Sequence, residues 1–192
     1  MPHRTLHTAA GALQDTVTEA ATAGTDTIIL RGASTNTTAA TLTLGANIEN
    51  LDASGTGTSL LNLTGNTLAN VLTGNAAVNV ITGGAGADTQ DGRNGSDVYV
   101  VASQTDYTGD VIADTGTGAG DVDELRFAAT AAGTLTLSAA VTGVERIVIG
   151  TGTAAAAVTT GTVTEAVSKS AQDTAVAAAK ALIANLRSTL SA

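Results

Sequence analysis

Residues 65–100 read GNTLANVLT, GNAAVNVIT, GGAGADTQD and GRNGSDVYV, four nine-residue segments that align without a gap. The first position of each segment is a glycine, namely Gly65, Gly74, Gly83 and Gly92. The sixth position holds Asn70, Asn79, Asp88 and Asp97, and the eighth holds Leu72, Ile81, Gln90 and Tyr99. A glycine, an Asn or Asp and a large side chain at constant offsets indicate a repeat architecture.

Each position of this nonapeptide has a physical role. The first six residues predict a tight turn, in which glycine can take positive φ and Asn or Asp tolerates the left-handed region. The last three predict a short strand whose eighth residue faces one side and whose seventh and ninth face the other. Two nonapeptides complete one coil, so residues eighteen apart lie above one another and the eighth residues fill the interior. The sequence therefore predicts an all-β fold, a parallel β-roll or β-solenoid.

The turns predict a site for calcium. Asp88 and Asp106 are eighteen residues apart, so we expect both carboxylates to meet one cation, with carbonyl oxygens of the glycine turns completing its shell. On the other side Asp97 is expected over Asn79, a pair with one carboxylate and weaker binding. The candidate ligands are Asp88, Asp106, Asp97, Gly83, Ala85, Gly86, Gly92, Asn94, Gly95 and Asn79. Oxygen donors alone favour calcium over magnesium, and no soft donor is present for zinc.

Two simpler interpretations compete with this site. The Asn and Asp side chains could only satisfy backbone groups of the turns, and for Asn70 and Asn79 that interpretation is at least as strong. Nine of the seventeen acidic residues fall between Asp88 and Glu124, and Arg93 is the one basic residue in that stretch of the sequence. These acids could simply form a solvated acidic face. Stacked carboxylates repel one another unless a cation lies between them, however, which favours calcium.

The segments GGAGADTQD and GRNGSDVYV resemble the nonapeptide of the RTX (hemolysin-type) calcium-binding repeat proteins, GGxGxDxUx, where U is a large apolar residue. Gln90 departs from that pattern at the large position, and Arg93 departs from it at the second glycine. The first two segments keep the period but have Asn in place of Asp. They resemble the degenerate coils that precede the calcium-loaded coils in this family. The resemblance implies a calcium-loaded β-roll in a secreted protein, exported with an uncleaved C-terminal type I secretion signal.

A longer repeat flanks the nonapeptides. GTDTIIL (24–30) and TLTLGANIENLDASGTGT (41–58) return as GDVDELRF (120–127) and TLTLSAAVTGVERIVIGTGT (134–153). We interpret these blocks as irregular coils of the same solenoid, which gives flanking coils at 16–62 and 107–160 around a β-roll at 63–106, after a leader at 1–15.

The C-terminal segment, 161–192, has helical periodicity. An apolar stripe predicts an α-helix near 164–190, formed by Val176, Ala179, Ile183, Leu186 and Leu190. This helix could cap the open end of the solenoid, pair with a second copy or belong to the secretion signal.

The composition excludes several functions. A net charge of -9 and a pI near 4.3 make nucleic acid a poor partner. No stretch is apolar enough for membrane insertion, and no catalytic motif is present, so we expect no enzyme.

We expect a calcium-dependent structural or adhesive module of a secreted bacterial surface protein, of the surface-layer or adhesin type. Its partners would be calcium ions, other copies or cell-surface polysaccharide. The alternatives are a secretion and stabilising module of a larger secreted enzyme, and a carbohydrate- or ice-binding surface.

Overall fold

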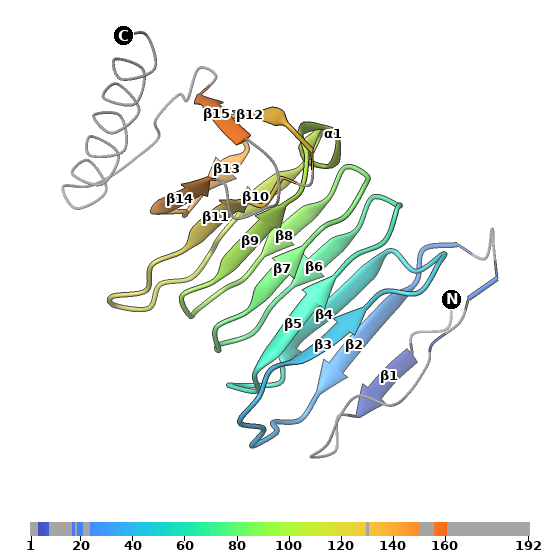
Figure 1. Ribbon diagram of the computed structural model, residues 1–192. Helices are drawn as coiled ribbons and strands as arrows, with labels where there is room; N and C mark the ends of the chain where they lie inside the picture. The colour runs from blue at the N-terminus through green and yellow to red at the C-terminus, as the bar shows by residue number, and fades with distance from the viewer. Residues whose placement is uncertain are drawn as a thin grey trace, which may run out of the picture.

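The computed structural model describes residues 4–7, 17, 19–20, 24–129, 131–149 and 156–160, with the backbone alone for 4–7 and 156–160. The chain winds into a β-solenoid in which two parallel sheets face each other (Figure 1). The first sheet contains, in spatial order, β1 (Arg4–His7), β2 (Thr27–Arg31), β4 (Asn50–Gly55), β6 (Val71–Thr73), β8 (Thr89–Asp91), β10 (Val111–Ala113) and β13 (Val141–Thr142).

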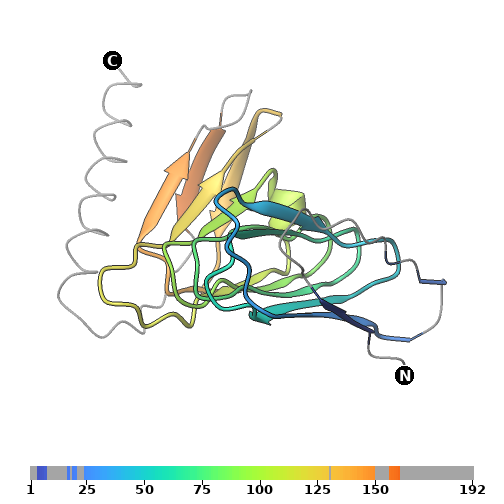
Figure 2. The ribbon, with the colours of Figure 1, turned by 90° about the horizontal axis from the view of Figure 1, so that it is seen from below.

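The second sheet contains, in spatial order, β14 (Arg146–Ile149), β11 (Glu124–Phe127), β9 (Val98–Val101), β7 (Val80–Thr82), β5 (Leu61–Thr64) and β3 (Ala40–Thr43). A separate pair, β12 (Gly133–Leu137) and β15 (Ala156–Thr160), lies at the C-terminal end of the described chain. Figure 2 shows the turns that carry the chain from one sheet to the other along the stack. The predicted all-β parallel solenoid is confirmed. The leader at 1–15, apart from β1, and the helix predicted near 164–190 lie outside the described residues.

The eighth residues of the nonapeptides, together with Leu63 one period upstream, form two interior ladders, one in each sheet. In the second sheet Leu63, Ile81 and Tyr99 stack in register and are completely buried. In the first sheet Leu72 and Gln90 stack in the same way. Burial of one such aliphatic side chain contributes roughly 1.5–3 kcal/mol, so these ladders hold the coils together. Alternate strand positions face outward, as the period of two requires.

Two coils are longer than the nonapeptide period predicts. After β9 the chain forms α1 (Gln104–Tyr107), a single helical turn in which the Ser103 side chain accepts from the backbone N–H of Asp106. Tyr107 from this turn is buried. Between β10 and β11 a second long turn spans 114–123. These additions project beside the stack, so the strands that follow them still pair in parallel with the coil below.

The longer repeat is also present in the structure, as two copies of one pairing pattern. In the first flanking unit (residues 24–64), β2 pairs with β4 and β3 pairs with β5. In the second flanking unit (residues 120–160), β11 pairs with β14 and β12 with β15. Asp26 N donates to Glu49 Oε2 at 2.8 Å, and Asp123 N donates to Glu145 Oε2 at the same distance. The first unit therefore continues both sheets of the solenoid, whereas in the second unit β11 and β14 continue the second sheet and β12 and β15 form the separate pair.

Candidate metal centre

One ladder of buried polar side chains joins Asn70, Asp88 and Asp110. Asn70 N donates to Asp88 Oδ1 at 2.8 Å, and Asp88 N donates to Asp110 Oδ1 at 2.9 Å. We predicted Asp106 above Asp88, and that register is wrong, because the coil containing α1 lengthens the spacing from 18 to 22 residues. Asp106 instead lines a cavity of about 20 Å³ together with Asp110 and Gly83.

A second ladder on the opposite side joins Asn79, Asp97 and Asp123. Asn79 N donates to Asp97 Oδ1, and Asp97 N donates to Asp123 Oδ1, both at 2.7 Å. The spacing grows here from 18 to 26 residues because the coil containing α1 and the long turn at 114–123 both lie between Asp97 and Asp123. This side was expected to hold one carboxylate per pair. The structure places two acids in contact, so the expected difference between the two sides disappears.

The Asn turns are closed by hydrogen bonds within the chain. Asn70 Oδ1 accepts from Asn66 N at 2.8 Å, and Asn79 Oδ1 accepts from Asn75 N at 3.0 Å. The amide nitrogens donate to the coil below, with Asn79 Nδ2 at 2.7 Å from the carbonyl oxygen of Leu61. Both ends of each amide have a backbone partner, so these turns need no cation.

The Asp turns leave one carboxylate oxygen without a donor. Asp88 Oδ2 and Asp97 Oδ2 are buried and have no hydrogen-bond partner. In the Asn turns the donor is the residue four positions earlier, whereas here that residue is Gly84 or Arg93, with φ of 99° and 75°. Arg93 N donates to Asp91 Oδ1 instead. A buried, unpaired carboxylate oxygen is costly unless a proton or a cation lies beside it.

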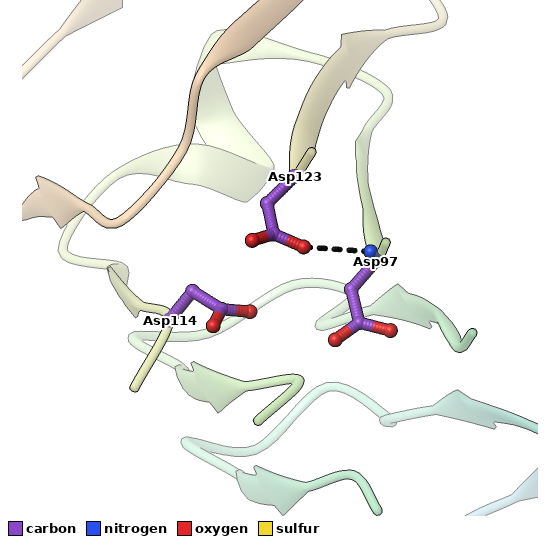
Figure 3. A group of neighbouring side chains, drawn as sticks. All are labelled: Asp97, Asp114 and Asp123. Carbon is purple, nitrogen blue, oxygen red and sulfur yellow. Dashed lines mark hydrogen bonds between the residues drawn. The ribbon is translucent and has the colours of Figure 1, made fainter. Parts of the chain in front are cut away.

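Three carboxylates converge on the second ladder. Asp97, Asp114 and Asp123 each offer one oxygen, and these oxygens lie within 4.8 Å of one another. Figure 3 shows the side chains approaching from separate segments, before β9, after β10 and before β11. The pairing of Ile112 with Gln90 places Asp114 over Gly92, at the glycine position of the coil. The arrangement is an all-oxygen donor set of the kind that hard divalent cations bind.

The Tyr99 hydroxyl orients this cluster from the interior. It donates to Asp114 Oδ2 at 2.6 Å and accepts from Gly92 N at 2.6 Å. Asp114 Oδ1 accepts from Gly116 N at 2.7 Å. The ion pairs among the described residues are those of Arg31 with Asp52 and of Arg126 and Arg146 with Glu124. No basic side chain in the described part of the chain therefore neutralises the three aspartates.

Burial makes these carboxylates hard to ionise without a cation. Desolvation raises the pKa of Asp97 to about 7, and the nearby charges of Asp114 and Asp123 contribute to that rise. Desolvation also raises the pKa of Asp123 to about 6 and that of Asp110 to about 6. Such shifts are typical of carboxylates that share a site with other negative charges.

We expect the metal-free protein to be more stable at pH 5 than at pH 8. The folded-state pKa values of Asp97, Asp110 and Asp123 exceed 3.8, so the folded chain binds more protons than the unfolded chain between about pH 4 and pH 7. Stability therefore falls as pH rises through that window, at about 1.4 kcal/mol per unit of pKa shift. Denaturant unfolding in chelator at several pH values measures it. A metal-free stability that rises with pH would contradict the expectation.

On the first ladder, Gln90 adds a buried amide. Gln90 is 1% exposed, its Nε2 lies 3.5 Å from Asp110 Oδ2, and its Oε1 has no partner. A Cβ at Gly83 would lie 2.3 Å from Asp88 Oδ2 and 2.9 Å from Gln90 Nε2, so only glycine fits against both groups. Gln90 stands where the nonapeptide has a large apolar residue, and it thus brings a polar group to the carboxylates.

The other predicted ligands lie in the turns beside these ladders. Gly86 and Gly95 have φ of 129° and 118°, and a Cβ at Gly86 would lie 2.3 Å from the carbonyl oxygen of Leu68. Asn94 Oδ1 accepts from Thr117 N at 2.9 Å. The ligand roles of these residues, and those of Ala85 and Gly92, stay predictions.

The predicted ligand set did not include Asp110, Asp114 and Asp123. Asp110 and Asp123 each stand directly before a strand, as Asp88 and Asp97 do, and this shared position was the available signal. Asp114 stands at a position where the nonapeptide has glycine, so the period gave no reason to select it.

We expect Asp88→Ala to weaken calcium binding by at least tenfold and Asn70→Ala to leave it nearly unchanged. Removal of the Asp88 carboxylate takes away the oxygen that has no donor. Asn70 instead donates to the carbonyl oxygens of Ile48 and Glu49, so its loss costs about 1–3 kcal/mol of stability. Isothermal titration calorimetry of both variants separates the two effects. Equal calcium affinities would contradict the assignment.

No family model, curated protein or solved structure matched this chain. In the described part of the chain, no helix has the length and apolar character needed to cross a membrane.

Proposed function

We propose that this chain is a calcium-stabilised β-roll that serves as a structural or adhesive module of a secreted bacterial surface protein. The observation that carries the proposal is the carboxylate of Asp97. It is completely buried, its Oδ2 has no donor, and oxygens of Asp114 and Asp123 lie within 4.8 Å of the oxygen that Asp97 offers. A cation among these groups would supply the missing charge.

Calcium suits these residues better than the other common divalent metals. Every donor is an oxygen and the carboxylates come from separate turns, which favours a large and irregular shell. Magnesium demands a strict octahedron and retains its water, and zinc would recruit nitrogen or sulfur donors. When bound, calcium would neutralise carboxylates of adjacent coils and hold those coils together.

The same chemistry couples folding to the environment. Without a cation, buried aspartates repel one another, so the stack is weakened at neutral pH. A cation that binds only the folded state stabilises it by mass action. This behaviour suits a chain that leaves the cell loosely folded and becomes rigid where calcium is abundant. The similarity of its turns to RTX nonapeptides supports this proposal.

The outward faces support a structural role more than ice recognition. Thr43, Thr64 and Thr82 form one row across three coils of the second sheet, which continues with Val100. The neighbouring row contains Thr41, then Asn62 and Val80. A regular surface of paired threonine columns is thus not present on this face of the described chain. Adhesion to other copies or to cell-surface polysaccharide remains part of the proposal.

Direct calcium binding tests the proposal. Chelator-treated protein should bind calcium in isothermal titration calorimetry, and magnesium at the same concentration should give little heat. The double variant Asp88→Asn, Asp97→Asn should lose most of this binding, whereas Asp52→Asn, outside both ladders, should retain it. Full calcium binding by the double variant would refute the assignment.

A further inference from the structure

The end of the first flanking unit is covered by a coil that contains no aspartate. Val71 N donates to the carbonyl oxygen of Glu49 at 2.9 Å, which adds β6 to β4. Asn66 Nδ2 donates to the carbonyl oxygens of Gly45 and Ile48, both at 2.8 Å. Two neutral amides, those of Asn66 and Asn70, thus close the junction between the unit and residues 65–82, the coil formed by the first two nonapeptides.

This cover buries the core-facing residues of β4. Leu51 is 1% exposed and Ala53 is completely buried, with Leu72 of β6 paired to Leu51. On the other sheet β7 covers β5 in the same way, with Ile81 paired to Leu63.

Within the part of the chain that the structure describes, the second flanking unit has the same edge without such a cover. Ile147 and Ile149 of β14 occupy the positions of Leu51 and Ala53, because Arg146 follows Glu145 as Asn50 follows Glu49. Their exposures are 38% and 39%. Within the described residues, β14 pairs only with β11, and β15 pairs only with β12. An apolar strand edge of this kind is a template for the addition of another strand.

We propose that the outer edges of β14 and β15, with Ile147 and Ile149, form a docking surface for a further coil of the type seen at residues 65–82. The occupant is an extended segment with glycine at the first position of each nonapeptide, Asn at the second and sixth, and an aliphatic residue at the eighth. One of its Asn amides would donate to the carbonyl of Val144, which corresponds to Ile48. The internal duplication identifies this occupant, because the coil at residues 65–82 covers the equivalent edge of the first flanking unit.

This docking does not rest on calcium binding. The junction at the first unit uses amide and backbone donors alone, so a failure of the calcium proposal would leave this one intact.

A labelled peptide with the sequence of residues 65–82 tests the surface in solution. We expect saturable binding to the full chain in fluorescence anisotropy, and at least tenfold weaker binding of the peptide with Asn66→Ala and Asn70→Ala. The protein variant Ile147→Asp should lose the binding, because it places a charge on the apolar edge. Val78→Asp, at a residue 50% exposed in a distant turn, should retain it.

A fused coil removes the dependence on peptide affinity. Residues 65–82 inserted after Thr160 of the full chain should slow hydrogen exchange of the Ile147 amide at least tenfold relative to a scrambled insertion. Equal exchange in the two chains would overturn the proposal. Protection of β14 by self-association of the unmodified chain would overturn it too, since a second copy would then be the occupant.

Discussion

Calcium is expected to raise the melting temperature of this protein by about 5–10 °C over the value in excess chelator. Calcium at about a hundred times the dissociation constant of one site adds about 2.7 kcal/mol to the free energy of unfolding. Each 1 kcal/mol or so shifts the melting temperature of a chain of this size by roughly 2–4 °C. The gain has a structural cause, because calcium would neutralise the buried oxygens of Asp88 and Asp97 that have no donor.

Magnesium at equal concentration is the matched control for this experiment. Its small, strictly octahedral shell fits carboxylates from separate turns poorly, so we expect a shift of less than a third of the calcium value. Thermal unfolding followed by circular dichroism at pH 7.5 measures both. Identical melting curves in calcium and in chelator would show that no cation joins the coils.

The substitution Asp97→Asn is expected to stabilise the metal-free protein while removing the calcium response of the second ladder. The change replaces Oδ2 with an amide that can donate to the neighbouring carboxylates of Asp114 and Asp123. Asn retains Oδ1, which accepts from Asn79 N. Loss of a buried charge and gain of a donor should add roughly 1–3 kcal/mol in chelator. Calcium affinity at this ladder should fall by at least tenfold.

Asn79→Asp is the reciprocal variant and should behave in the opposite way. It removes the 2.7 Å bond from Asn79 Nδ2 to the carbonyl oxygen of Leu61 and adds a buried carboxylate under Asp97. We expect roughly 2–4 kcal/mol less stability in chelator, with part of the loss recovered in calcium. Urea unfolding of both variants, with and without calcium, gives the four values needed. A metal-free Asp97→Asn protein less stable than the wild type would contradict this account.

The nonapeptide period alone determined the class of fold and the direction of most side chains between 63 and 101. A strand of three residues has only two faces, so a fixed large residue at every ninth position must point to one interior. The same period placed Asp88 and Asp97 at the ends of turns, and the matching blocks around Glu49 and Glu145 indicated equivalent strands on either side of the nonapeptides. These features depend on local chemistry, which is why the sequence was sufficient for them.

Only the tertiary structure decided which acids meet. The turn with α1 projects beside the stack, so a count of eighteen residues selects Asp106 where the pairing selects Asp110. The turn at 114–123 lengthens the spacing from Asp97 to Asp123 in the same way. No local pattern states how many residues project before the next strand pairs, because the pairing is set by backbone hydrogen bonds to a distant coil. The left-handed backbone of Arg93 and the convergence of Asp114 on Asp97 and Asp123 depend on those same long-range contacts.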